Sequence, residues 1–179
     1  MATDAPARTV SRTRNDLPEE TRAKMIELLN QRLADCIDLQ TQSKQAHWNV
    51  KGPSFFGLHT LFDQINEAVE TYVDEIAERA AQLGGQVEGT AKLVAERSVL
   101  PEYPHEIKDG MDHVRAMSVA LSTFGRCARE AIDQADEAED KDTADIFTEI
   151  SRGIDKWLWF VEAHAQGGQG PEAQLAKKK

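Results

Sequence analysis

The chain has 179 residues, 40% of them hydrophobic and 29% charged, which is typical of one globular domain with its own core. Its formal net charge of -10 disfavours a dedicated nucleic-acid binder and favours a surface that attracts cations. The N-terminus has no apolar signal core, no apolar run is long enough to span a membrane, and Cys36 and Cys127 lie outside any CxxC spacing, so we expect a cytoplasmic protein without disulfide bonds.

Two long helices are predicted in the first half of the chain. The first extends from about residue 19 to residue 50, and Pro18 fits its first turn. The second extends from about residue 54 to residue 83 and is stopped by Gly84 and Gly85. Apolar residues recur at helical spacing in both: Met25, Ile26, Leu29, Leu33 and Ile37 in the first, and Leu58, Leu61, Phe62, Ile65, Val69, Val73, Ile76 and Ala80 in the second.

The second half contains a connection and two further long helices. Residues 86–104 include two prolines and show no long period, so they are predicted to form a crossover with a short helix over residues 91–96. Long helices follow over about residues 105–138 and 143–165. Asp142 and the threonine after it are predicted to cap the last helix, and two glycines at 167 and 168 to stop it.

These elements predict an all-α protein. Two short links and one long crossover, between the second and third long helices, are the topology of a ferritin-like four-helix bundle. The bundle is expected to span residues 19–165. A flexible basic tail is expected at residues 1–18 and a second flexible tail at residues 166–179.

The second long helix carries two pairs of candidate metal ligands. His59 and Asp63 are four residues apart, and so are Asp74 and Glu78. On a helical wheel both pairs lie roughly 100° to 200° from the apolar stripe, so they share a face that points away from the core. An ordinary solvated helix face has the same pattern and is the alternative interpretation.

A single metal ion could not contact both pairs within one chain. Asp63 and Asp74 are about 16 Å apart along the helix axis, whereas metal bonds to nitrogen and oxygen are about 2 Å long. A two-fold axis across the helix would bring the first pair of one subunit to the second pair of another. If the pairs bind metal together, each helix therefore holds two half-sites.

His47 is a further candidate ligand, near the end of the first helix and twelve residues before His59. Its alternative role is that of an ordinary hydrogen-bonded histidine in the interior or at an interface. The spacing alone leaves both roles open.

The run HWNVKGPSFFGLHTLFD, followed by DEIAERAAQLGG, resembles the ferroxidase signature of the Dps family of miniferritins. A second run, DTADIFTEISRGIDKWLWFVEAH, extends the resemblance over about residues 19–165. The resemblance implies a dodecameric shell in which iron(II) is oxidised, preferably with hydrogen peroxide, and stored as a ferric oxyhydroxide mineral. Such a shell would protect the cell and its DNA from oxidative damage. The five-ligand pattern matches the spacing of the family without insertion: His47, His59, Asp63, Asp74 and Glu78.

The resemblance also implies how these ligands are shared. His47, His59 and Asp63 would come from one subunit, and Asp74 and Glu78 from its neighbour. Two iron ions would bind at each shared site of the interface, and the same nitrogen and oxygen ligands would also hold zinc. Asp63 would be either a direct ligand of the weaker position or a residue that acts through a second shell.

Residues 135–149 form an acidic stretch that precedes and begins the last helix. Carboxylates near a helix N-terminus are favoured by the helix dipole, which is the simplest interpretation. The resemblance indicates instead that Asp142 and Asp145 border a three-fold pore that guides cations inward.

Two other functions would also suit an all-α protein with candidate metal ligands. The di-iron site of the larger ferritins lies inside one bundle and needs Glu-x-x-His motifs on facing helices. The single such spacing here, Glu102 to His105, contains Pro104 and lies in the crossover, so we reject that site.

The non-enzymatic rival is a structural protein that compacts the nucleoid and binds metal incidentally. Residues 1–18 carry a formal charge of +1 and residues 165–179 carry +2, against -13 for the rest of the chain. Only a sequence-independent contact between DNA phosphates and these tails is expected, and it would weaken steeply with salt.

Overall fold

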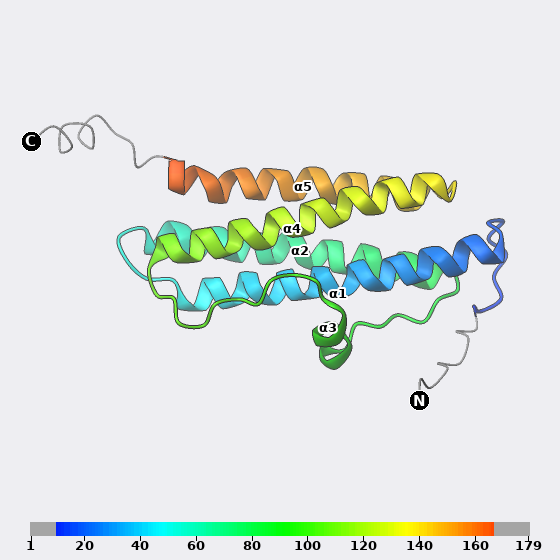
Figure 1. Cartoon of the computed structure of the whole chain (residues 1–179), viewed down its shortest axis with the longest axis horizontal. Helices are drawn as coiled ribbons and strands as arrows, with labels where there is room; N and C mark the ends of the chain where they lie inside the picture. Colours follow the sequence, from blue (N-terminus) through cyan, green and yellow to red (C-terminus); the bar gives the residue numbers. More distant parts are fainter. Residues whose placement is uncertain (1–9, 167–179) are drawn as a thin grey trace, which may run out of the picture.

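The computed structural model describes residues 10–166, and five helices make up most of them (Figure 1). None of the helices in this range combines the length and the apolar character that a bilayer crossing requires. The helices are α1 (Glu19–Asn49), α2 (Phe55–Gln82), α3 (Ala91–Arg97), α4 (Gly110–Glu137) and α5 (Lys141–Gln166).

The four long helices form a bundle of two antiparallel hairpins, α1 with α2 and α4 with α5 (Figure 1). Helices α2 and α4 run in the same direction, so the chain must return along the whole bundle between them. This return explains the long crossover, which passes over α1 and contains α3. The predicted all-α four-helix bundle with a helix in its crossover is confirmed.

Two predicted helix starts are wrong. The third long helix begins at Gly110 rather than near residue 105, because the Asp109 side chain caps it by accepting the Met111 N–H at 2.8 Å. The last helix begins at Lys141, where Asp140 accepts the Thr143 N–H at 3.1 Å. Asp142 therefore lies inside the first turn of α5 and is not its cap.

The core lies between the apolar stripes of the four long helices. Phe62, Phe124 and Phe147 are fully buried at its centre and come from α2, α4 and α5. The stripe predicted on α2 is buried except for Val73, which is partly buried against the same cluster. The acidic face of α2 consequently points away from the bundle interior, as its spacing predicted.

Polar side chains of α1 bind the crossover backbone. Asn30 accepts the Glu88 N–H and donates to the Gln86 carbonyl, each at 3.0 Å. Asp35 accepts the Val99 N–H at 2.9 Å, and burial raises the pKa of this carboxyl group above its ordinary value. Helix α1 is therefore buried on two faces, by the bundle and by the crossover.

The described part of the predicted N-terminal tail lies against the end of α2. The Ser11 N–H donates to the Gly84 carbonyl at 2.8 Å. At the same end of α2, the guanidinium of Arg22, which belongs to α1, donates to the Leu83 carbonyl at 2.9 Å. The rest of the two predicted tails, residues 1–9 and 167–179, lies outside the described residues, as does the predicted glycine stop after α5.

Gly84 provides a test of this end of the bundle. Its φ is +90°, and an added Cβ would lie 2.6 Å from the Ser11 carbonyl oxygen. We expect Gly84→Ala to lower the free energy of unfolding by roughly 1–3 kcal/mol, because both backbone strain and a clash result. Gly57→Ala is the control, since an added Cβ there meets nothing within 4 Å. Urea unfolding measures both variants, and a Gly84→Ala protein as stable as the parent would contradict the assignment.

Candidate metal centre

A tight turn places the end of α1 against the start of α2. Helix α1 ends at Asn49, and Gly52 then adopts a φ of +106°, which reverses the chain. The Gly52 carbonyl accepts the Phe55 N–H at 3.0 Å, and α2 begins there. As a result His47, in the last turn of α1, faces His59, in the second turn of α2.

The two histidines are joined by a reciprocal pair of hydrogen bonds. Nδ1 of His47 lies 2.8 Å from the His59 carbonyl oxygen, and Nδ1 of His59 lies 2.8 Å from the His47 carbonyl oxygen. The rings stack with centroids 3.7 Å apart and planes inclined by 21°. A carbonyl oxygen can only accept, so each Nδ1 carries its proton. Each ring in its neutral form thus keeps the Nε2 lone pair available to a metal ion.

Asp63 lies one turn beyond His59 and is already paired with a cation. The Lys44 ammonium donates to Oδ1 of Asp63, and Nδ1 of His47 lies 3.8 Å from the same oxygen. The hydrogen bond from Lys44 holds the pKa of Asp63 below its ordinary value. A metal ion that takes Oδ1 of Asp63 must therefore displace the ammonium of Lys44.

The structure brings together three of the five predicted ligands and leaves the other two apart. His47, His59 and Asp63 are neighbours at the α1–α2 junction. Asp74 and Glu78 are exposed further along α2. Within residues 10–166, no group of three or more histidine, cysteine or acidic side chains converges as the ligands of one metal ion.

The acidic stretch at the α4–α5 turn divides into a buried and an exposed part. Asp140 is buried and pairs with Arg79 of α2 at 2.7 Å. Asp142 and Asp145, the predicted pore residues, are exposed in the first turns of α5. The prediction did not single out Arg79, although its position three residues after Ile76 places it beside the apolar stripe of α2.

Lys44 is the other charged residue whose role the prediction missed. It lies in α1, three residues before His47. Residues three apart on a helix share a face, so the spacing itself signalled a lysine beside the histidine.

The Glu102–His105 motif lies on the surface of the crossover. Nε2 of His105 is 4.0 Å from Oε1 of Glu102, and both side chains are exposed. Neither residue is part of a helix that faces the bundle interior. These positions agree with the rejection of an intra-bundle di-iron site.

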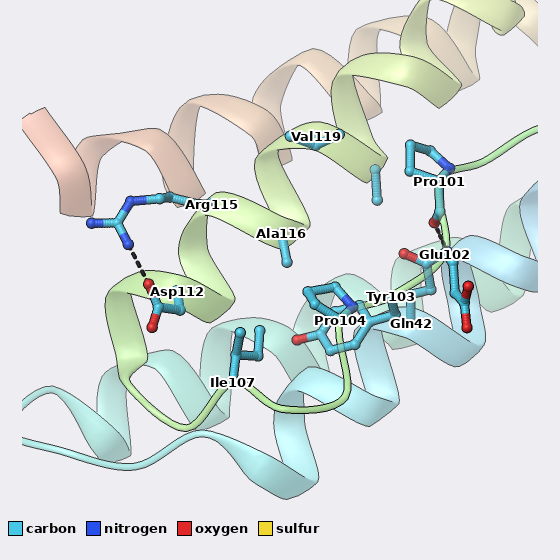
Figure 2. A pocket seen from close by; sticks show the side chains of 11 residues that line it. Gln42, Pro101, Glu102, Tyr103, Pro104, Ile107, Asp112, Arg115, Ala116 and Val119 are labelled. Carbon is cyan, nitrogen blue, oxygen red and sulfur yellow. Dashed lines mark hydrogen bonds and ion pairs between the residues drawn. The ribbon is translucent and has the colours of Figure 1, made fainter.

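Two surface hollows lie away from the candidate ligands. An open cleft of about 290 Å³ separates the crossover from α4, with Tyr103 and Ile107 on one side and Val119 on the other (Figure 2). Asp112 and Arg115 form an ion pair at its edge. A larger groove of about 750 Å³ lies between α1 and the segment that contains α3. None of the five candidate ligands lines either hollow.

Known proteins resemble the chain over most of its length. Residues 26–169 match the family of the ferritin-like domain. The chain is 44% identical over 155 residues to the DNA protection during starvation protein of Agrobacterium fabrum, which covers 87% of this chain and 96% of that relative. Among solved structures, Dps from Mycobacterium smegmatis has a TM-score of 0.83 at 30% identity and covers 89% of this chain and 98% of its own. DpsC from Streptomyces coelicolor has a TM-score of 0.84 at 28% identity, with coverages of 91% and 95%.

The pairing of Lys44 with Asp63 can be tested with a redox-inert metal. Lys44→Met removes the competing ammonium, so we expect Zn²⁺ to bind roughly two- to fivefold more tightly, a gain of about 0.5–1 kcal/mol. Isothermal titration calorimetry measures this affinity. Lys24→Met, at an exposed lysine of the same helix, serves as the control and should leave it unchanged. An unchanged Zn²⁺ affinity in Lys44→Met would show that the ammonium does not compete for Asp63.

Proposed function

Because the chain belongs to the Dps family of ferritin-like proteins, we propose that it oxidises iron(II) at a site shared between two subunits and stores the ferric product in a hollow dodecameric shell. The observation that carries this proposal is the reciprocal hydrogen bonding of His47 and His59. It leaves the Nε2 atoms of two stacked, partly buried rings without their protons, so that they can act as ligands.

Carboxylates of a second subunit would complete the site. Asp74 and Glu78 lie too far along α2 to reach the iron held by the histidines of their own chain, since Asp63 and Asp74 are about 16 Å apart. Both are exposed in the single subunit and therefore available to a partner. A two-fold axis across α2 would bring them opposite the histidines of the other subunit. Their negative charge would there offset the positive charge of iron(II).

Asp63 would serve the weaker of two iron positions. Its carboxylate is held by Lys44 in the absence of metal, so the cost of displacing the ammonium lowers the affinity of that position. The stronger position would be formed by the histidines and the partner carboxylates. This order of occupation fits a site in which iron is substrate and must leave after oxidation.

Two iron ions held at one shared site allow a two-electron reaction. Each iron(II) gives one electron to the same molecule of hydrogen peroxide, whose O–O bond breaks. Two iron(II) ions, one hydrogen peroxide and two waters give two FeOOH units and four protons, and no hydroxyl radical is released. Iron storage would in this way protect the cell and its DNA. Zinc would bind the same ligands without being oxidised and would inhibit the reaction.

Iron(II) would enter the shell at the α4–α5 turn. Asp142 and Asp145 are exposed there, and we assign them to the border of a three-fold pore. Exposed carboxylates attract cations at low salt, where screening is weak.

Compaction of DNA is the alternative function, and the geometry favours it less. Arg12 and Arg14 are exposed, but Ser11 beside them is hydrogen-bonded to Gly84, which holds this segment against an acidic body. A long-range attraction to phosphate would have to overcome the net charge of -10. Iron oxidation is therefore the primary function that we assign.

Subunit mixing tests the shared site. A two-fold interface holds two shared sites. We expect His59→Ala/Asp63→Ala protein and Asp74→Ala/Glu78→Ala protein to be inactive alone, because every site then lacks one of its two halves. After disassembly and joint reassembly, half of the interfaces pair the two kinds of subunit, and each of these holds one intact site. About one quarter of the parental rate of iron(II) oxidation should return, as measured by the absorbance of the ferric product.

Each double variant, disassembled and reassembled alone, is the control and should stay inactive. Native mass spectrometry verifies that the two kinds of subunit have exchanged. Mixed shells without any activity, despite verified exchange, would rule out a site shared in this way.

A further inference from the structure

We propose that Asp140 is a positioning residue for iron entry, because it binds Arg79 and so keeps the carboxylate of Asp142 free for cations. This inference rests on the proposed entry of iron(II) at the α4–α5 turn. Asp140 itself cannot meet iron in the folded subunit, since only 2% of its side chain is exposed.

Asp140 is the acceptor at the centre of a buried hydrogen-bond network. Nη2 of Arg79 donates to its Oδ1 at 2.7 Å, and the Thr143 N–H donates to the same oxygen at 3.1 Å. The Thr143 hydroxyl donates to its Oδ2 at 2.6 Å. Nε of Arg79 in turn donates to the Thr143 hydroxyl oxygen at 3.0 Å. Both carboxylate oxygens of Asp140 are thus occupied, and α2 is fixed to the start of α5.

The same guanidinium lies between a buried and an exposed carboxylate. Nη1 of Arg79 is 3.7 Å from Oδ2 of Asp142, which is too long for a hydrogen bond. The Asp142 side chain is 83% exposed, whereas that of Arg79 is 6% exposed. Arg79 therefore donates its short hydrogen bond to Asp140 and not to Asp142, and the carboxylate of Asp142 faces the solvent.

Removing the charge of Asp140 would redirect Arg79. A buried guanidinium without a counterion is strongly unfavourable, so it turns to the nearest carboxylate. Asp142 is that carboxylate. The neighbouring Lys141 would not replace Arg79 as its partner, because Lys141 pairs with Asp136 at 2.7 Å. The negative charge of Asp142 would then be neutralised, and it would no longer attract iron(II) to the proposed entry at the α4–α5 turn, although Asp142 itself is unchanged.

The first readout is structural and does not involve iron. Asp140→Asn keeps the size of the side chain and an oxygen that can accept the Thr143 N–H. In a crystal structure of this variant, we expect the Arg79 guanidinium within hydrogen-bond distance of Asp142. An Arg79 that stays more than 3.5 Å from Asp142, the limit for a hydrogen bond, would overturn the inference whatever the route of iron.

The second readout is the initial rate of iron(II) uptake by assembled shells at low salt. Asp140→Asn and Asp142→Asn should each slow uptake by roughly fivefold, and the slowing should fade at high salt. Removing the guanidinium charge should reverse the effect, so Asp140→Asn/Arg79→Gln should regain most of the parental rate. A purely structural role predicts the opposite, since two lesions in one network would slow uptake further. Glu137→Gln, at an exposed carboxylate near the same turn, is the control for the loss of one carboxylate, and it leaves the pair of Lys141 with Asp136 intact.

The outcomes separate the two proposals. If Asp142→Asn slows uptake but Asp140→Asn does not, the proposed positioning role of Asp140 is wrong, whereas the proposed entry of iron(II) at the α4–α5 turn is supported. If Asp142→Asn has no effect, the entry is wrong, and the crystal structure still decides how Asp140 holds Arg79. Should Asp140→Asn shells fail to assemble, Arg79→Gln alone decides the matter. It should take up iron at least as fast as the parent, and slower uptake would contradict the inference.

Discussion

The metal chemistry that we propose for this subunit depends on the two hydrogen bonds that join His47 and His59. Each imidazole donates its Nδ1 proton to the backbone carbonyl of the other residue, so one interaction fixes both ring orientations and both tautomers. It exists because the turn through Gly52 is short enough to place the end of α1 beside the second turn of α2. Loosening that turn would release the Nε2 atoms from the position in which they can serve as ligands.

Basic side chains of the subunit bind two of its carboxylates. Lys44 holds Asp63 near the histidines, and Arg79 holds Asp140 at the opposite end of α2. In both pairs a basic side chain of one helix binds an acidic side chain outside that helix, so the packing of the bundle also determines which carboxylates remain exposed. Asp74, Glu78 and Asp145 are exposed, and Asp142 is exposed with its nearest guanidinium nitrogen 3.7 Å away.

Much of the fold could be predicted because burial follows the helical period. The apolar stripe of α2 and the glycines that stop this helix were predicted from local spacing. The crossover was predicted from the length of the segment between the second and third long helices. The starts of α4 and α5 could not be placed, because several acidic residues near each start can serve as caps and only the packing selects Asp109 and Asp140. The ligand spacing was visible within one helix. The partners of Asp63 and Asp140 were not, since Lys44 and Arg79 come from other parts of the chain.

A crystal structure of the assembled protein loaded with Zn²⁺, with the metal located by its anomalous scattering, tests the shared site most directly. The expected result is a metal ion bound through Nε2 of His47 or His59 and, across a two-fold axis, by Asp74 and Glu78 of the partner subunit. Zinc bound only by ligands of a single chain, or through Nδ1 after loss of the reciprocal hydrogen bonds, would contradict it.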